Sequence, residues 1–155
     1  MTQRTARAFT PLEERLVDLG SKIMSRLNTW AFRASGGRLG GTFLYGAPVM
    51  LVTTIGRKTG ERRTTPLLYL REGDALVTVA SKGGSARHPG WYRNLLADPE
   101  VEVQIGGERR TMRARTASDE EKRRLWPRLT AMYPPYDGYQ ARTDRDIPVV
   151  VLEPR

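Results

Sequence analysis

The stretch VMLVTTIGRKTGERRTTPLLYL, residues 49–70, carries the pattern that decides the fold. Two runs rich in β-branched and apolar residues, 49–55 and 64–70, flank a segment with glycine at positions 56 and 60. Runs of this length and composition on either side of a glycine-containing turn are typical of β-strands. The stretch therefore predicts two strands joined by a turn at 56–63.

Similar short runs recur along the rest of the chain. Glu72-Gly73-Asp74 and Gly106-Gly107 mark two hairpin turns. The other predicted strands cover 42–45, 75–80, 101–105, 109–116 and 147–152. Helices are predicted at 89–97 and 119–132, the second opened by the capping box Ser118-x-x-Glu121. This order predicts a mainly β domain of the α+β class, a small barrel with flanking helices.

An amphipathic helix is predicted at 12–33, before the strands begin. Apolar residues recur there at three- and four-residue steps, the period of one helix face, at Leu12, Leu16, Leu19, Ile23, Leu27 and Trp30. The other face carries Arg15, Lys22, Arg26 and Arg33. Two interpretations stay open: the helix lies on an anionic membrane, or its apolar face packs on the barrel. In either case residues 1–34 form a basic helix and 35–155 the barrel of a single globular domain.

The composition limits the chemistry. The 155 residues include no cysteine and one histidine, His88, which excludes disulfides, thiol chemistry and multi-histidine metal sites. A redox enzyme of this composition needs an organic cofactor, and we expect no metal. The net charge of +9 predicts an anionic partner. Because no run of about 18 apolar residues and no signal-peptide pattern is present, we expect a cytoplasmic protein, peripheral to the membrane if the first helix binds there.

The turn GRKTGERR at 56–63 is the first candidate for an anion site. Four of its eight residues are cationic. Its glycines permit backbone angles that direct N–H groups inward, and lysine and arginine form charge-assisted bonds with phosphate or carboxylate oxygens. A solvated basic hairpin is the alternative interpretation.

Two later stretches also carry candidate ligand-binding groups. Ser81-Lys82-Gly83-Gly84 follows a predicted strand, so a hydroxyl, an ammonium group and bare backbone can meet one ligand there. A flexible loop with an incidental lysine is the alternative. The segment from His88 to Asn94 enters a predicted helix whose free N–H groups attract anions. We interpret His88 itself as a loop residue rather than a catalyst.

Three tyrosines, Tyr133, Tyr136 and Tyr139, stand at three-residue steps beside Pro134 and Pro135. Their rings can form the wall of a pocket for a flat substrate, and their hydroxyls can donate hydrogen bonds or a proton. Alternatively, they pack a helix end onto the core.

Read together, these stretches resemble the deazaflavin (F420)-dependent nitroreductase family, relatives of the flavin-binding split β-barrels. The resemblance rests on GRKTG at 56–60, ASKGG at 80–84, WYRNL at 91–95 and the tyrosine cluster. It covers nearly the whole chain, from SRLNTW at 25–30 and GGTF at 40–43 to TDR at 143–145 and IPVVV at 147–151.

The resemblance implies a split β-barrel that binds coenzyme F420 and passes a hydride from it to a quinone or a nitroaromatic acceptor. The phosphate and acidic tail of the cofactor are expected at Arg57, Lys58, Thr59 and Arg63. The deazaflavin is expected to contact Thr64, Thr65, Pro66, Leu67, Leu68, Val79, Ala80, Ser81, Lys82, Gly90, Trp91, Tyr92, Arg93, Asn94 and Tyr136. The acceptor pocket, including a proton donor, is expected at Ser81, Tyr133, Tyr136 and Tyr139.

One departure from the family concerns the acceptor. Close members carry a tyrosine after Pro-Leu where this chain has Leu68, and Tyr69 points to the opposite face of a regular strand. The use of nitroimidazole acceptors is therefore left open.

An FMN-dependent oxidoreductase on the same barrel is the alternative enzyme. A nucleic-acid-binding barrel would suit the charge, but no RNP-like or GxxG clamp pattern with interleaved aromatics occurs, so we expect no nucleic acid partner.

Overall fold

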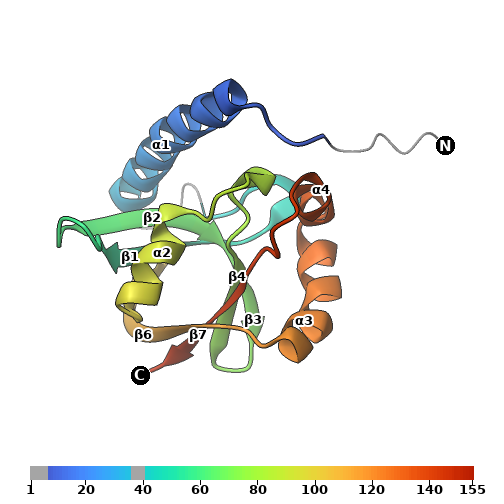
Figure 1. Cartoon of the computed structure of the whole chain (residues 1–155). Helices are drawn as coiled ribbons and strands as arrows, with labels where there is room; N and C mark the ends of the chain where they lie inside the picture. The colour runs from blue at the N-terminus through green and yellow to red at the C-terminus, as the bar shows by residue number, and fades with distance from the viewer. Residues whose placement is uncertain (1–6, 36–40) are drawn as a thin grey trace.

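Residues 7–35 and 41–155 are described by the computed structural model, and in these ranges the chain forms one antiparallel sheet of seven strands surrounded by helices (Figure 1). The strands are β1 (Val49–Ile55), β2 (Arg62–Leu68), β3 (Leu70–Glu72), β4 (Ala75–Val79), β5 (Glu100–Ile105), β6 (Glu108–Thr116) and β7 (Val149–Pro154). The helices are α1 (Pro11–Ala34), α2 (Gly90–Ala97), α3 (Asp119–Met132) and α4 (Pro135–Arg142), with 3-10 turns η1 (Leu44–Gly46) and η2 (Lys82–Gly84). The predicted mainly β domain with flanking helices is confirmed.

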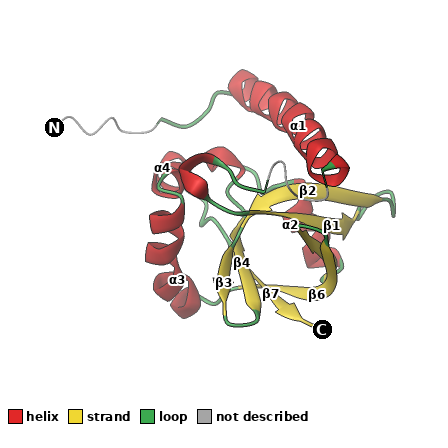
Figure 2. Cartoon of the chain, turned by 180° about the vertical axis from the view of Figure 1, so that it is seen from behind, coloured by secondary structure: helices red, strands yellow, loops and turns green. Residues whose placement is uncertain are grey.

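The sheet curls because its two edge strands are consecutive in the chain. The strand order β2-β1-β5-β6-β7-β4-β3 places β2 and β3 at opposite edges, yet Tyr69 alone separates them. The edges must therefore approach each other at Tyr69, and Figure 2 shows the resulting half-barrel. Tyr69 is buried, and its N–H donates to the carbonyl of Pro48. The single strand predicted at 64–70 is thus corrected to two strands that meet at this bend.

Two hydrophobic cores lie on opposite faces of the curled sheet. The inner core is enclosed by the strands and by α2, with Trp91 and Leu95 of the helix among its buried side chains. The outer core lies between the sheet and the helices α3 and α4, with Leu125 and Leu129 of α3 fully buried. Because neighbouring residues on a strand point to opposite faces, β4 contributes to both cores.

The tyrosine segment contains a helix that the sequence analysis missed. α3 begins and ends where predicted, opened by the capping box of Ser118 and Glu121. The two prolines end α3, as expected, but Pro135 also occupies the first turn of α4, where its fixed φ angle favours a new helix. The prolines therefore separate two helices.

The strand predicted at 42–45 is wrong. Thr42 forms an isolated bridge with Pro48, and Leu44–Gly46 is a 3-10 turn. Tyr45 has φ +64° and Gly46 has φ +71°, both in the left-handed region. Two such residues in succession reverse the chain, which is incompatible with an extended strand.

α1 lies outside the sheet, across β2, in both overall views (Figures 1 and 2). The capping box of Thr10 and Glu13 opens it, and the buried Phe32 anchors its final turn. The large apolar residues of its apolar face are exposed rather than packed on the barrel, with exposed fractions from 53% at Ile23 to 72% at Trp30. The interpretation in which this face packs on the barrel is therefore wrong.

Candidate functional site

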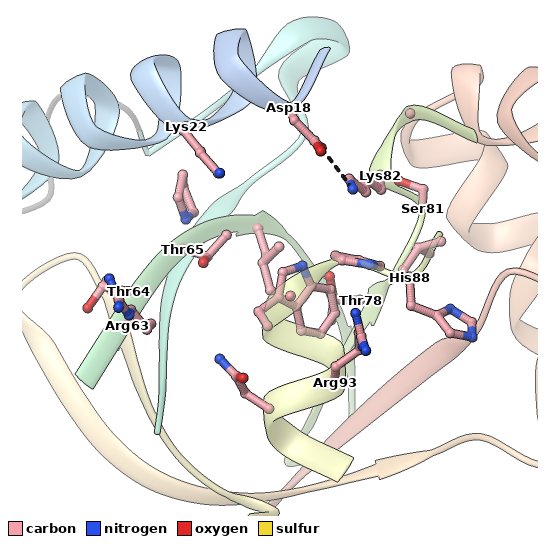
Figure 3. Close-up of a pocket in the computed structure, with 18 of the residues that line it drawn as sticks. Asp18, Lys22, Arg63, Thr64, Thr65, Thr78, Ser81, Lys82, His88 and Arg93 are labelled. Atoms are coloured by element: carbon pink, nitrogen blue, oxygen red, sulfur yellow. Dashed lines mark ion pairs between the residues drawn. The ribbon is translucent and has the colours of Figure 1, made fainter. Parts of the chain in front are cut away.

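A groove of about 980 Å³ opens between α1, β2, β4, the start of α2 and the tyrosine segment (Figure 3). All three stretches singled out in the sequence line it. The predicted residues that line it are Arg57, Lys58, Thr59, Arg63, Thr64, Thr65, Pro66, Leu67, Leu68, Val79, Ser81, Lys82, Gly90, Trp91, Arg93, Asn94, Tyr133, Tyr136 and Tyr139. Two predicted residues, Ala80 and Tyr92, are buried in the inner core and do not line the groove.

The basic turn is held open by backbone bonds at its glycines. Gly56 donates its N–H to the carbonyl of Glu61 at 2.7 Å, and Gly60, at φ +71°, donates back to the carbonyl of Gly56 at 2.8 Å. A side chain at Gly56 would place its Cβ 2.8 Å from the Thr59 hydroxyl, so no larger residue fits without a shift. The glycines thus fix the loop that carries the cations Arg57 and Lys58.

Asn94 attaches this turn to α2. Its side-chain oxygen accepts from the backbone N–H of Arg57 at 3.2 Å and from the Arg57 guanidinium at 2.9 Å. Its amide nitrogen donates to the Thr54 hydroxyl at 3.2 Å. Asn94 is 6% exposed, so these bonds are shielded from water and hold the turn and the helix together on one side of the groove.

The opposite side of the groove is formed by Ser81 and η2. Lys82, at φ +45°, is followed by Gly83 and Gly84 at φ +61° and φ +82°, so the chain curls tightly here. A Cβ on Gly84 would lie 2.6 Å from the carbonyl of Tyr139, which explains the glycine: η2 is packed directly against α4. The Lys82 ammonium group is thereby directed to the groove mouth.

Arg145 fixes this loop from behind. Its guanidinium donates to the carbonyls of Ala80, Ser81 and Ser85 and lies 3.2 Å from Nδ1 of His88. Burial and the neighbouring Arg145 and Arg93 charges lower the pKa of His88, which keeps the imidazole neutral at pH 7. Nδ1 therefore accepts from Arg145. The His88 ring points away from the groove centre, in agreement with its interpretation as a loop residue (Figure 3).

The tyrosines form one contiguous cluster at the far end of the groove. The hydroxyl oxygens of Tyr133 and Tyr139 are 3.1 Å apart, and the Tyr133 and Tyr136 rings meet edge to face with centroids 5.0 Å apart. Burial raises the pKa of Tyr133 and of Tyr136 above the ordinary phenol value. Both hydroxyls are therefore protonated at neutral pH and can donate a hydrogen bond.

Eleven described residues line the groove without having been assigned to the site from the sequence. They are Asp18, Lys22, Arg26, Phe43, Val49, Gly56, Thr78, Gly83, Arg87, His88 and Pro89. The first three come from α1 at four-residue steps, so they share one helix face. The four-residue spacing indicates that these three residues share a helix face, but no feature of the sequence indicated that α1 lies over β2. Thr78 is 1% exposed and its hydroxyl has no hydrogen-bond partner in the described part of the chain.

The groove is strongly cationic. Among the described residues that line it are eight lysines and arginines and one carboxylate, Asp18. Asp18 pairs with Lys82 at 2.8 Å, and Glu14, one turn earlier, accepts from the Ser85 hydroxyl and the Ala86 N–H. These contacts hold the N-terminal half of α1 over η2. The excess of cations over carboxylates along the groove suits an anionic ligand that is long enough to contact several of them.

Within residues 7–35 and 41–155, no cluster of three or more His, Asp or Glu side chains could hold a metal ion. No helix in the same ranges is both long and apolar enough to cross a bilayer.

Comparison with known proteins places the chain in a family. The family model described as F420H(2)-dependent quinone reductase matches residues 24–154. The F420H(2)-dependent quinone reductase Rv1261c of Mycobacterium tuberculosis is 44% identical over 133 residues, covering 84% of this chain and 89% of the relative.

Solved structures agree with the sequence match. A structure of the F420-H2 dependent reductase FDR-A superposes with a TM-score of 0.63 at 43% identity, covering 68% of this chain and 94% of the other. A second chain, described as a domain-swapped dimer, gives a TM-score of 0.66 at 36% identity and covers 88% of this chain and 98% of its own. The half-barrel is thus shared with F420-dependent reductases. The chain belongs to the F420H(2)-dependent quinone reductase family.

Proposed function

We propose that this protein binds reduced coenzyme F420 in the cationic groove and reduces a quinone at the tyrosine end. The observation that carries the proposal is the division of the groove into two chemically different parts. Five of the eight lysines and arginines that line the groove lie on the basic turn or on α1, whereas Leu68, Tyr133 and Tyr136 give another part of it an aromatic and apolar surface. A cofactor with an anionic tail and a flat ring system matches that division.

The residues of the groove fit the chemistry of F420. Its phosphate and acidic tail are anionic, and the Lys58 side chain forms no ion pair with any described residue, which leaves it free to bind them. Bare backbone at Gly83, which lines the groove, allows a close approach of a ring. When bound, the reduced deazaflavin supplies the hydride. The protein then has to orient the two reactants and supply a proton.

The proposed proton donors are the hydroxyl groups of Tyr133, Tyr136, Tyr139 and Ser81. Burial raises the pKa of Tyr133 and Tyr136, so both phenols are protonated at neutral pH and are weaker acids than an exposed tyrosine. Their rings are packed against one another, so each hydroxyl is held in a restricted position. Holding the acceptor against such a fixed wall lowers the entropic cost of reaching the reactive geometry.

We infer that quinones are the main acceptors and that nitroaromatic compounds are reduced as a secondary activity. Leu68 lines the groove, while Tyr69 is buried in the inner core on the other face of the chain. The acceptor end therefore lacks the additional phenol that close relatives of the nitroreductase type carry. A leucine gives a planar quinone an apolar contact but offers a nitro group no hydrogen bond.

FMN is the competing cofactor. FMN carries one phosphate, which the turn at 56–63 alone could satisfy. The cations Lys22 and Arg26, further along the groove, favour a longer anion.

Titrating the apo protein with F420 and with FMN, followed by fluorescence, tests the proposal directly. We expect F420 to bind at least tenfold more tightly and to support menadione reduction in its reduced form. Tighter binding of FMN, or no turnover with reduced F420, would overturn the proposal.

We further propose that the protein contacts the membrane peripherally, at its inner face, through α1. Six large apolar side chains of this helix are more than half exposed, at Leu12, Leu16, Leu19, Ile23, Leu27 and Trp30. An exposed apolar stripe of this length is typical of a helix that lies in a lipid surface. A quinone dissolved in the membrane would then lie near the groove, since the inner face of the same helix covers it.

A further inference from the structure

The inner face of α1 is a row of polar side chains over β2. Asp18, Lys22 and Arg26 line the groove, and Arg33, two turns further on, donates to the Thr64 hydroxyl of β2 at 3.0 Å. Figure 3 shows Lys22 pointing from α1 into the groove above Thr65. The usual arrangement is reversed here, because the apolar face of the helix is outside and the charged face is inside. The charged face therefore calls for its own explanation.

The groove continues beneath this face. A second hollow of about 520 Å³ lies between α1 and β2 and is lined by Arg26, Thr29, Trp30, Arg33, Ala34 and Thr64. Arg26 and Thr64 line both hollows, so the two lie side by side. The hydroxyl oxygen of Thr29 is buried in this region and has no hydrogen-bond partner among the described residues. A path thus leads from the basic turn to the last turn of α1.

This path carries positive charge that the protein does not neutralise. Neither Lys22 nor Arg26 forms an ion pair within the described ranges, and the hydrogen bond of Arg33 goes to a neutral hydroxyl. Other surface cations, in contrast, are paired with carboxylates. Arg115 binds two glutamates at 2.7 and 2.8 Å, and Arg124 binds one at 2.7 Å. Like charges left together without counterions repel one another, so the row under α1 is arranged for an anion from outside.

We propose that the carboxylate-bearing tail of the cofactor runs beneath α1, from the basic turn toward Arg33. Lys22, Arg26 and Arg33 are its ion-pair partners, and the Thr29 hydroxyl donates a hydrogen bond to it. This inference rests on the proposed function, since it concerns the same cofactor. It makes α1 part of the cofactor site on one face, while the other face stays available for the membrane. Forms of the cofactor with more carboxylates then bind more tightly.

The test compares ligands that differ only in their anionic part, titrated against the full chain by fluorescence at low salt. The probes are F420 with its acidic tail, the same molecule with the phosphate but no tail, and the deazaflavin riboside without either. The variant is Lys22→Gln with Arg26→Gln. Arg15→Gln is the matched control, because Arg15 is an exposed cation of the same helix that lines neither hollow.

For the double variant we expect the Kd of tailed F420 to rise about five- to tenfold, as for two solvent-accessible ion pairs, while the Kd values of both tail-less probes stay within about twofold. Arg15→Gln should leave all three Kd values unchanged. Equal affinity of the parent for tailed and tail-less F420, or an equal loss for all three probes, would overturn the inference and leave the proposed function standing. Failure of the parent to bind any of the three would overturn both.

Discussion

The carboxylate of Asp18 on α1 lies 2.8 Å from the ammonium nitrogen of Lys82 on η2, across the mouth of the cationic groove. Lys82 is the more buried partner, with 20% of its side chain exposed against 37% for Asp18. Asp18 therefore neutralises the charge of Lys82, a cation to which an anionic cofactor could otherwise bind. The pair joins α1 to the barrel, and under the proposed function it would compete with the ligand.

Asp18→Asn is expected to strengthen cofactor binding, because it removes the carboxylate from the groove lining and frees Lys82. The pair is partly exposed, so the Kd of F420 should fall by about two- to fivefold. Fluorescence titration measures the change. Asp74→Asn is the control, since it removes the same charge from the exposed β3–β4 turn. A weaker affinity in Asp18→Asn would mean that the pair positions Lys82 for the ligand rather than competing with it.

Lys58→Ala and Arg63→Ala should each weaken F420 binding about tenfold, because each removes a charge-assisted bond of about 1.5 kcal/mol or more to the phosphate and tail. The effect should shrink as salt is added. Arg62→Ala is a matched control: Arg62 is adjacent to Arg63, pairs with Glu102 at 3.1 Å and does not line the groove. Unchanged Kd values in both test variants would remove the turn from the site.

The Tyr→Phe variants at 133, 136 and 139 identify the proton donor, because each keeps the ring and removes the hydroxyl. Loss of the donor should lower kcat with menadione by about 10²-fold and leave the Kd of F420 nearly unchanged. The hydroxyls of Tyr133 and Tyr139 share a hydrogen bond, so the double variant of these two should be scarcely slower than the slower single variant.

Tyr69→Phe serves as the control for these variants, since Tyr69 is buried in the inner core, outside the groove. It should turn over at nearly the parent rate. Parent rates in all three cluster variants would assign the proton to Ser81 or to water, and the tyrosines would then only form the wall of the pocket.

Leu19→Gln with Ile23→Gln should reduce membrane binding about tenfold or more without unfolding the protein. Both side chains are more than half exposed, so the folded chain loses little packing, whereas a lipid surface loses two apolar contacts. Co-sedimentation with vesicles of mixed neutral and anionic lipids measures binding, and thermal melting checks the fold. If the parent chain does not sediment with vesicles even at low salt, the outer face of α1 has another role.

Glu121→Gln should lower the free energy of unfolding by about 1 kcal/mol near pH 7, because Glu121 accepts two hydrogen bonds from Arg115. These bonds lower the pKa of Glu121 from 4.5 to about 2. A lowered pKa in the folded state means that this stabilisation is complete above about pH 4.5 and disappears as the pH falls toward 2.

Thermal melting of both forms from pH 7 to pH 2 checks that dependence, and the two melting temperatures should converge at low pH. Glu120→Gln, a neighbouring carboxylate without an ion pair in the described chain, should change stability less at every pH. A difference between parent and Glu121→Gln that is independent of pH would contradict the assigned ion pair.

Most local structure followed from local rules. Glycine turns and β-branched runs predicted the hairpins, and the box of Ser118 and Glu121 predicted the start of α3, because these features depend on residues close together in the chain. The errors arose where that locality failed. Tyr69 divides a continuous β-branched run because β2 and β3 occupy opposite edges of the curled sheet. Tyr45 takes a left-handed angle that its side chain does not reveal.

The sequence alone predicted the residues that we propose carry the chemistry: the cations of the turn, the Ser-Lys-Gly-Gly loop and the three tyrosines, all of which contribute residues to the groove. It also determined that the first helix has one apolar and one basic face. Only the tertiary structure decided which way that helix faces. A periodic pattern specifies two faces of a helix but not which one meets the protein, since that depends on contacts distant in sequence, here Asp18 with Lys82 and Arg33 with Thr64. Those long-range contacts turn the basic face of α1 into one wall of the groove and leave its apolar face outside.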